Sequence, residues 1–433
     1  MPPHDPVALG ASLPLWSVVP FAGLLLSIAL FPLFAPSLWA RHYAKVCLAF
    51  GVPVAAFFLL RAPRELVHTM LEYASFLILL ASLFTISGGI LLRGTLRGSA
   101  GVNCAILAVG AVLANVFGTT GASMLLIRPL LRANAQRQRK AHVVVFFIFV
   151  VANIGGALTP IGDPPLFLGY LRGVPFFWTL RAMGLLWAVA VGLVIGVFFL
   201  VDRRAFALDE VAGADAESGA EATEPGASMP ASGGEARVPL SIDGKINLPL
   251  LMVVIGAVFL PTPWRETAMA AAAVVSAWKT PAKVREENEF TWYPIGEVAI
   301  LFAGIVATMI PALLILKARG AELGVATPAH FFWATGALSS FLDNAPTYLT
   351  FFSLAQGVGG AQTVAGVSAP LLQAIGAGAV FMGANSYIGN APNFMVKAIA
   401  EEAGVRMPSF FGYMAWSCGI LLPIFALLTL IFF

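Results

Sequence analysis

Hydrophobic and polar positions divide the chain into long apolar runs separated by short polar stretches. The runs that can cross a hydrocarbon core of roughly 30 Å lie at 13–34, 44–61, 66–92, 141–171, 176–201, 246–262, 267–279, 291–316, 366–400 and 409–433. Glycine, proline and asparagine interrupt 141–171 and 366–400, and 267–279 is short for a span. The pattern predicts about ten transmembrane helices, two of them interrupted.

Two further apolar stretches are broken in the middle by polar, turn-forming residues. The stretch 101–132 contains "NVFGTTG" and the stretch 329–356 contains "LDNAPT". A chain inside a membrane can turn only where protein or trapped water satisfies its backbone. We therefore expect two re-entrant helical hairpins.

A polar linker separates the two apolar halves. The stretch 209–243 is rich in Ala, Gly, Glu, Ser and Pro, contains eight of the 22 acidic residues, and lacks hydrophobic periodicity. This composition is typical of disordered segments. It predicts three regions: a first repeat at 1–202, a disordered acidic linker at 203–245 and a second repeat at 246–433.

The two halves share landmarks at a nearly constant spacing. "IGDPP" (161–165) matches "IGNAP" (388–392) at 227 positions, Asn115 matches Asn344 at 229, and Glu72 matches Glu297 at 225. Each half has five crossings, so the second copy must be inverted, as in many secondary transporters. The predicted fold class is an all-α polytopic membrane protein built as an inverted repeat.

Composition supports this class and excludes others. The 433 residues are 59% hydrophobic and 11% charged, with a mean hydropathy of +0.87, whereas soluble domains are roughly 25% charged. No phosphate-binding loop, nucleophilic triad or Cys/His metal spacing occurs. We expect no enzyme activity, no cofactor and no nucleic-acid partner; the expected partners are membrane lipid and small ions.

The distribution of basic residues predicts the orientation. The side with more Lys and Arg should be cytoplasmic. It receives Arg93, Arg97, Arg132, Arg137, Arg139, Lys140, Arg203, Arg204, Lys279, Lys283 and Arg285. The other side receives Arg61, Arg64, Arg172, Arg181, Arg265, Lys317 and Arg319. Both termini are then exterior, the linker is cytoplasmic, hairpin 101–132 opens from the cytoplasm and hairpin 329–356 from the exterior, in a bacterial inner (plasma) membrane.

Asp163 is the leading functional candidate. It lies in "TPIGDPP", where prolines stop a helix, Gly162 permits a tight turn, and freed carbonyl groups face a cavity. Carbonyl oxygens and a carboxylate suit a hard cation such as sodium, and acids inside a membrane are functional by default. The alternative is a structural, helix-capping aspartate.

Other polar residues at the breaks are candidate ligands or structural clamps. The second half has Asn390 opposite Asp163, and its carboxylate comes from Asp343 at the tip of hairpin 329–356. The full candidate set for cation and proton binding is Asp163, Asp343, Asn115, Thr119, Thr120, Asn153, Thr159, Gly162, Asn344, Thr347, Asn385, Asn390 and Asn393. Asparagines at hairpin tips can instead stabilise turns, and Glu72 and Glu297 have a structural role as their favoured interpretation.

A buried carboxylate can hold a proton or a cation, and the two compete. That competition is the minimal mechanism of a sodium (or lithium)/proton antiporter. A proton- or sodium-coupled citrate carrier is disfavoured because two carboxylates repel an anion, although bound sodium could cover them. Arsenite, neutral as the acid, escapes this objection, and a non-transporting scaffold remains open.

At these motifs the sequence resembles the ion transporter superfamily, which includes NhaD-type sodium/proton antiporters, arsenite permeases and citrate or dicarboxylate carriers. "NIGGALTPIGD" and "SSFLDNAPT" look like the two aspartate segments of NhaD-type proteins, and "IGDPP" is similar to arsenite permeases. The resemblance implies sodium or lithium efflux coupled to proton entry through Asp163 and Asp343, an elevator-type mechanism and a homodimer.

Overall fold

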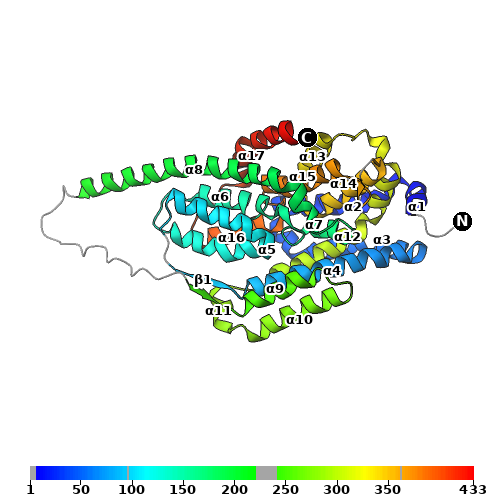
Figure 1. Ribbon diagram of the computed structural model, residues 1–433, viewed down its shortest axis with the longest axis horizontal. Helices are drawn as coiled ribbons and strands as arrows, with labels where there is room; N and C mark the ends of the chain where they lie inside the picture. Colours follow the sequence, from blue (N-terminus) through cyan, green and yellow to red (C-terminus); the bar gives the residue numbers. More distant parts are fainter. Residues whose placement is uncertain (1–5, 95–96, 221–240, 361–362) are drawn as a thin grey trace.

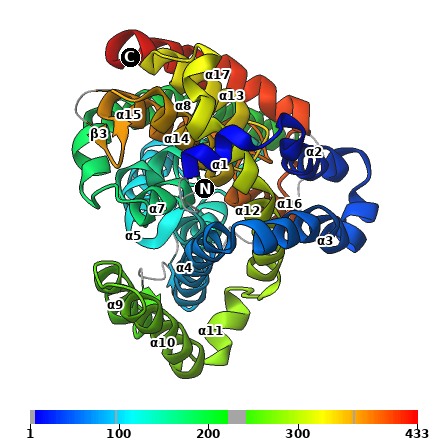
Figure 2. The ribbon, with the colours of Figure 1, turned by 90° about the vertical axis from the view of Figure 1, so that its right-hand side faces the viewer.

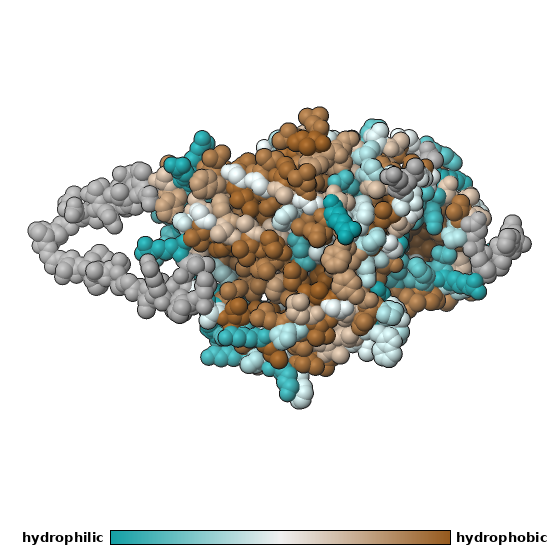
Figure 3. Space-filling view, in the orientation of Figure 1, coloured by the Kyte–Doolittle hydropathy of each residue, from teal (hydrophilic) through white to brown (hydrophobic). Residues whose placement is uncertain are grey.

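The computed structural model describes residues 6–94, 97–220, 241–360 and 363–433. The chain is mostly helical (79%), and eight of the described helices are long and apolar enough to cross a membrane. Apolar residues cover the middle of the face seen in Figure 3, and hydrophilic residues gather toward the two ends of the long axis. The protein is therefore an all-α polytopic membrane protein.

Twenty-one helical segments and four short strands make up the described chain. The first half contains α1 (Pro6–Ser12), η1 (Leu15–Val18), α2 (Val19–Phe34), α3 (Pro36–Arg61), α4 (Pro63–Ser87), β1 (Leu91–Arg93), α5 (Ala100–Ala133), α6 (Ala141–Val150), η2 (Ile154–Leu158), α7 (Pro164–Leu171) and α8 (Trp178–Ala220). The second half contains β2 (Ser241–Asp243), α9 (Asn247–Ala257), α10 (Trp264–Lys279), α11 (Ala282–Glu287), α12 (Tyr293–Arg319), η3 (Gly320–Leu323), α13 (Pro328–Ser339), α14 (Asn344–Val358), β3 (Thr363–Val364), β4 (Val367–Ser368), α15 (Ala369–Met382), η4 (Gly383–Asn385), α16 (Ala391–Glu402) and α17 (Phe410–Phe432).

Prolines set many helix starts. Pro36, Pro63, Pro164 and Pro328 each occupy the first position of a helix, where the missing N–H has no partner to lose and the fixed φ suits the helix. A single residue separates α2 from α3 and α3 from α4. The first three long helices therefore run up and down as close neighbours.

The long helices pack in reciprocal groups. Helices α2 and α3 pack on α12, α9 and α10 pack on α4, and α4 packs on α12. Figure 2 shows α9 and α10 on one side of α4, with α3 and α2 on another side. These six helices form one wall of the molecule, which we call the α4–α12 wall. The broken helices pack on its inner side.

Helix α6 lies deepest among the broken helices. Every residue from His142 to Val150 is buried, as expected for a helix that is apolar on all sides. It packs against α5 and α8 and, through α16, reaches the second half of the chain. The interruption that follows it is therefore enclosed by protein rather than by lipid.

Helix α5 turns back on itself. Gly118 has φ 73° and ψ 158° in the middle of the segment, a conformation open mainly to glycine. The two ends meet, because Gly98 N–H donates to the Ala133 carbonyl at 2.7 Å and Asn103 and Asn134 exchange side-chain hydrogen bonds of 3.0 and 2.8 Å. The predicted hairpin 101–132 is thus observed as a helical hairpin with its tip at Gly118.

The second hairpin consists of α13 and α14. The residues between them, Ser340 to Asp343, leave the helical conformation, and Asp343 accepts the Ala345 N–H at 3.1 Å as the N-cap of α14. The prediction at 329–356 agrees with these helices to within two residues at each end.

Helix α8 departs from the sequence prediction. We expected it to end at 201 and the disordered linker to begin at 203, but the helix continues to Ala220 and extends beyond the body of the molecule (Figure 1). The segment from 203 to 220 contains many alanines and no proline, and alanine is the best helix former. The rest of the linker at 221–240 lies outside the described residues.

The end of the predicted linker is ordered by pairing. β2 pairs antiparallel with β1, so that Leu91 lies opposite Asp243. Arg93 Nε contacts Asp243 Oδ2 at 2.5 Å, and Arg93 also forms an ion pair with Glu287. The prediction that 241–245 belongs to a disordered segment was wrong, because an edge strand and an ion pair could not be inferred from composition.

The predicted span 246–262 is also shorter in the structure. Helix α9 ends at Ala257 after 11 residues, too few to cross a bilayer alone. Pro261 and Pro263 follow, and proline disfavours helix in the residue before it. The next predicted span, 267–279, begins three residues earlier as α10.

A buried charged network joins the ends of α5, α6 and α8. Asp202 is 0% exposed, and its Oδ1 lies 2.6 Å from Arg137 Nη1 and 2.7 Å from His142 Nε2. Asn103 Nδ2 donates to Oδ2 at 3.0 Å. The sequence interpretation overlooked Asp202 as a buried acid because it lies just past the predicted span end, where aspartates are usually solvated.

We expect Asp202→Ala to destabilise the protein by about 3–5 kcal/mol, because it removes the carboxylate that the buried Arg137 and His142 both face. Thermal unfolding in detergent measures the change. Glu401→Ala is the matched control: its partner Lys397 lies 2.7 Å away at the surface, so its effect should stay below about 1 kcal/mol. Equal melting temperatures for the two variants would show that the buried network contributes no stability.

Candidate functional site

Asp163 lies at the break between η2 and α7. It occupies the N-cap position of α7, yet its side chain makes no capping hydrogen bond. Pro164 and Pro165 begin the helix, so the first helical N–H groups that a cap would accept from are missing. The side chain is 1% exposed and is directed to other elements. The alternative interpretation as a helix cap is therefore not supported by the geometry.

Three neutral donors surround the Asp163 carboxylate. Thr119 Oγ1 donates to Oδ1 at 2.8 Å, Asn344 Nδ2 donates to Oδ2 at 2.5 Å, and Asn390 Nδ2 lies 3.4 Å from Oδ1. These residues come from the tip of the α5 hairpin, the tip of the α13–α14 hairpin and the second helix break. The fold thus brings three distant segments of the chain to one carboxylate.

The α5 hairpin is fastened to the break that contains Asp163. Thr119 N–H donates to the Gly162 carbonyl at 2.8 Å. Asn115 Oδ1 accepts the Leu158 N–H at 2.8 Å, and its Nδ2 donates to the Ala111 and Gly155 carbonyls at 2.9 and 2.7 Å. Asn115 therefore satisfies backbone groups that the broken helix leaves free, and this position acts as a clamp.

Asn115 and Ser340 make matching contacts in the two hairpins. The side chain of each donates a hydrogen bond to the backbone carbonyl four residues earlier, which is Ala111 for Asn115 and Gly336 for Ser340. Each backbone carbonyl accepts a hydroxyl hydrogen bond, from Thr159 at 2.6 Å and from Ser386 at 2.5 Å. The sequence comparison paired Asn115 with Asn344; these contacts pair Asn115 with Ser340 instead.

This correction changes which residues correspond at the site. With Asn115 opposite Ser340, Thr119 falls opposite Asn344, and these are the residues that donate to the two oxygens of Asp163. The same spacing of 225 positions relates Glu72 to Glu297. The sequence comparison aligned two asparagines because residue identity was its criterion, whereas the fold matches positions by their hydrogen bonds.

A chain of amides connects the two helix breaks. Asn390, at the N-cap of α16, donates to Asn153 Oδ1 at 3.2 Å, and Asn153 donates to Asn393 Oδ1 at 2.6 Å. Asn393 in turn donates to the Gly383 and Ser386 carbonyls at 2.8 and 2.9 Å. All three asparagines are at most 2% exposed. Buried polar groups of this kind are costly unless they are paired, so the chain fixes the two breaks to one another.

Two asparagine side chains each carry one buried, unpaired oxygen. These atoms, Asn344 Oδ1 and Asn385 Oδ1, have no hydrogen-bond partner among the described residues. Asn344 Oδ1 belongs to the same amide that donates to Asp163. Buried unpaired oxygens are uncommon, and an ion or a water commonly satisfies them. With Asp163 and Thr119 Oγ1, the Asn344 oxygen is suited to a hard cation.

Asp343 has a different environment from Asp163. It is only partly buried, and Oδ1 caps α14 through the Ala345 N–H. Thr347 Oγ1 donates to the Asp343 backbone carbonyl at 3.0 Å, so Thr347 closes the first turn of the helix. No hydrogen bond joins Asp343 to Asp163 in the described chain. The structure therefore places the two candidate carboxylates near the same region but not in one shared ligand set.

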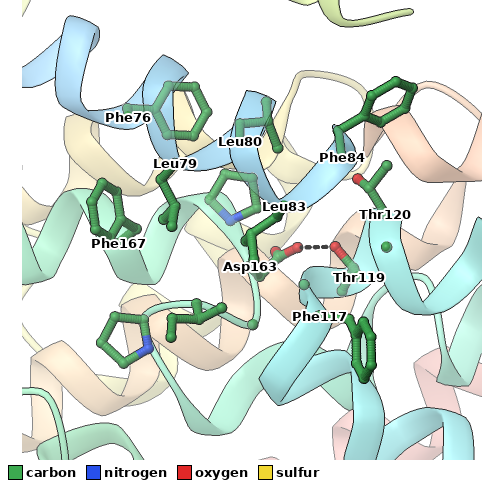
Figure 4. A pocket seen from close by; sticks show the side chains of 16 residues that line it. Phe76, Leu79, Leu80, Leu83, Phe84, Phe117, Thr119, Thr120, Asp163 and Phe167 are labelled. Atoms are coloured by element: carbon green, nitrogen blue, oxygen red, sulfur yellow. Dashed lines mark hydrogen bonds between the residues drawn. The ribbon is translucent and has the colours of Figure 1, made fainter. Parts of the chain in front are cut away.

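Two small cavities lie against these carboxylates. The first, about 20 Å³, is bounded by Asp163, Thr119, Thr120 and the α4 side chains Phe76 and Phe84. Figure 4 shows the α4 side chains lying over Asp163 and the Asp163–Thr119 hydrogen bond below them. The sequence interpretation missed this apolar cover, because nothing in the spacing of α4 distinguishes phenylalanines that face a site from those that face lipid.

The second cavity, about 60 Å³, is lined by Asp343, Asn390, Pro392, Met395 and by side chains of α4 and α12. Both cavities share five lining residues, which come from α4, α5 and α7: Phe76, Leu80, Phe84, Thr120 and Pro164. Because their walls are shared, they form adjoining spaces. No Lys, Arg or His lines either space within the described residues.

Glu72 and Glu297 do not line these cavities. Glu72 Oε2 pairs with Arg172 Nη2 at 3.1 Å, and His68 lies 3.8 Å from its other oxygen. Glu297 is half-buried near the start of α12. The favoured structural interpretation of Glu72 agrees with its ion pair. No cluster of three or more His, Cys, Asp or Glu that could hold a metal occurs in the described chain.

Comparison with known proteins identifies the family. A family model described as "Putative citrate transport" matches residues 10–433, so the chain belongs to this family. Membership is consistent with the resemblance to the ion transporter superfamily and indicates a transporter rather than an enzyme. No curated protein matches the sequence.

We expect Gly162→Ala to disrupt the site, because a Cβ there would overlap the Gly156 carbonyl oxygen and lie 3.0 Å from Asn115 Oδ1. The predicted loss of stability is about 1–3 kcal/mol, with loss of transport. Gly192→Ala on α8 is the control, since its Cβ would meet nothing within 4 Å. Melting temperatures and transport rates of both variants test this; wild-type behaviour of Gly162→Ala would contradict the tight turn.

Proposed function

Starting from membership of this family, we propose that the protein is a secondary active transporter that exchanges sodium or lithium for protons at Asp163. The observation that carries the proposal is a buried carboxylate at a helix break, surrounded by neutral donors and an unpaired amide oxygen. A carboxylate with no cationic partner in a dry site is available to a proton or a metal ion in turn.

The charge of the cavities favours a cation. Two carboxylates and no basic side chain line them in the described chain. An anion entering this space would meet repulsion from Asp163 and Asp343, whereas a monovalent cation would neutralise one of them. The electrostatics of the site therefore support sodium, lithium or a proton as the species bound directly.

The size of the cavities also favours a small monovalent cation. A cavity needs roughly 10–15 Å³ of space open to a water centre to hold one water, so spaces of about 20 and 60 Å³ admit an ion with a few waters. Pockets for organic ligands usually measure roughly 300 Å³ or more. In the conformation described here, the two spaces therefore suit a bare or partly hydrated ion better than a tricarboxylate.

The neutral hydrogen-bond donors around Asp163 explain how this site can release a bound proton or ion. Thr119, Asn344 and Asn390 stabilise the charged carboxylate between proton release and ion binding, so neither step leaves a bare charge in the protein interior. A proton arriving at Asp163 removes the charge that attracts sodium, and sodium displaces the proton. Exchange follows from this competition, with no energy source other than the two ion gradients.

The proposed movement uses an inverted repeat. The matching contacts of Asn115 and Ser340, and the reciprocal packing of α2 and α3 on α12 and of α9 and α10 on α4, support two halves related by inversion. The two hairpins would be re-entrant. In an elevator-type mechanism they move with the broken helices against the α4–α12 wall, which carries Asp163 from one side of the membrane to the other.

The orientation remains part of the proposal. The start of α1 and the end of α17 lie away from the far end of α8 (Figure 1), which agrees with exterior termini and a cytoplasmic linker in an inner membrane. A homodimer is expected from the resemblance to the superfamily. These features would place the α5 hairpin tip toward the membrane centre from the cytoplasmic side and the α13–α14 tip from the exterior.

Citrate transport is the second candidate, because the family model that matches residues 10–433 carries that description. It requires a conformation in which α4 and α12 separate from the hairpin tips and enlarge the second cavity. Bound sodium ions would have to cover Asp163 and Asp343 before citrate entered. The carrier would then be sodium-coupled, and Asp163 would retain its role.

Proton movement in proteoliposomes with an internal pH dye tests the proposal. Sodium or lithium should drive proton movement through the wild type. Asp163→Asn should lower the rate by at least about tenfold, because the neutral amide neither takes up a proton nor offers a negative charge to sodium. Glu401→Gln, which alters a surface carboxylate, is the control and should exchange normally.

Labelled citrate uptake in the same vesicles separates the two candidates. Proton movement driven by sodium without citrate supports the antiporter. Citrate uptake that needs sodium, with no exchange in its absence, would replace it with the citrate carrier. Normal exchange by Asp163→Asn would overturn the assignment of the site under either candidate.

A further inference from the structure

The second cavity has a chemistry of its own. Its walls are Phe76, Leu80 and Phe84 from α4 and Pro294, Ile295, Val298 and Phe302 from α12, and its polar groups are Asp343, Asn390 and Thr120. We call the space bounded by these residues the Asp343 vestibule. Three phenyl rings, one carboxylate and no basic group in the described lining make it complementary to a small monovalent cation.

Asp343 is placed to act there without contacting Asp163. Its Oδ1 is engaged by the Ala345 N–H, and Oδ2 makes no hydrogen bond within the described part of the chain. Asp343 as a whole residue is partly exposed, whereas Asp163 is 1% exposed. An ion can thus meet Asp343 while it still carries water, and can meet Asp163 only after losing most of it.

The vestibule adjoins the inner site through shared residues. Asn390 lines the vestibule and lies 3.4 Å from Asp163 Oδ1, and Asn344, next to Asp343 in sequence, donates to Asp163 Oδ2. Thr120 and Pro164 border both spaces. A cation at Asp343 therefore has a short, polar route along one side of the vestibule to Asp163.

We infer that Asp343 forms a separate outer cation-binding site in which a partly hydrated ion waits before it is dehydrated at Asp163. The inference rests on the proposed function and predicts how the rate of exchange depends on the sodium concentration. Asp343 sets the apparent affinity for sodium, whereas Asp163 sets whether exchange occurs at all. The two carboxylates act in sequence and do not share one ion.

The larger volume and aromatic walls of the outer site make it less selective among monovalent cations than the inner site at Asp163. A space of about 60 Å³ is several times the roughly 10–15 Å³ that one water needs, so it can hold an ammonium ion with one methyl group as well as a partly hydrated sodium ion. Phenyl faces attract such cations. Methylammonium should occupy the vestibule, compete with sodium and stop short of the smaller inner site.

Asp343→Asn tests the inference in the proteoliposome assay. Asparagine is as good an N-cap as aspartate, so α14 keeps its start while the charge is lost. The sodium concentration for half-maximal exchange should rise about tenfold, which corresponds to the loss of one moderate ion contact, and the maximal rate at saturating sodium should stay within about threefold of wild type. Methylammonium should raise the half-maximal sodium concentration of the wild type severalfold and have little effect on the variant.

Phe84→Leu is a second variant that leaves both carboxylates in place. It should weaken inhibition by methylammonium more than it changes the response to sodium, because only the aromatic face is lost. Loss of exchange in Asp343→Asn at every sodium concentration would show that both carboxylates share one site. Unchanged half-maximal sodium and unchanged methylammonium inhibition in both variants would reduce Asp343 to a helix cap. If the wild type itself shows no sodium or lithium response, the proposed function fails, and this inference fails with it.

Discussion

The structure depends on how a negative charge is accommodated inside an apolar bundle. An aspartate near the centre of a membrane costs roughly 3 kcal/mol even in a helix that can adapt, and broken backbone adds unpaired polar groups. Here the two costs offset one another. The break at 159–163 exposes carbonyls and amides. The α5 hairpin tip satisfies some of them and delivers Thr119 to Asp163, and the α13–α14 tip delivers Asn344.

Two buried aspartates in this chain show what separates structure from function. Asp202 lies between Arg137 and His142, so its charge is already balanced by its neighbours, and it joins three helix ends. Asp163 has only neutral donors around it. They make its charge tolerable but do not cancel it. The first arrangement fixes helices, whereas the second leaves the charge of the carboxylate unbalanced by any cationic side chain among the described residues.

The α4–α12 wall completes the site from the apolar side. Its phenylalanines line both cavities, and an apolar surrounding strengthens the electrostatic interactions inside. The wall packs internally through α2, α3, α9 and α10, and its helices α4 and α12 also contact the hairpins and the broken helices. The wall thus packs on the polar, broken-helix unit and covers the charge of Asp163 from the apolar side.

The sequence by itself determined the broad architecture. Apolar runs near bilayer length and glycine and proline at the breaks were sufficient to predict most of the long helices, the two helical hairpins and the two interrupted helices. The expected span at 246–262 is only the 11-residue α9, and the predicted linker begins as part of α8. Asp163 also followed from sequence, because a carboxylate inside an apolar run is costly and is rarely kept there without a function. These features are local, and local composition and backbone preference decide them.

Only the tertiary structure decided which residues meet. Asn115 was paired with Asn344 by identity, yet its contacts match those of Ser340, and Thr119 and Asn344 proved to be the donors to Asp163. The length of α8, the pairing of β1 with β2, the buried Asp202 network and the phenylalanine cover were not apparent from the sequence either. Each depends on contacts between segments far apart in the chain, and sequence spacing carries no information about which side chain faces a cavity, a partner helix or lipid.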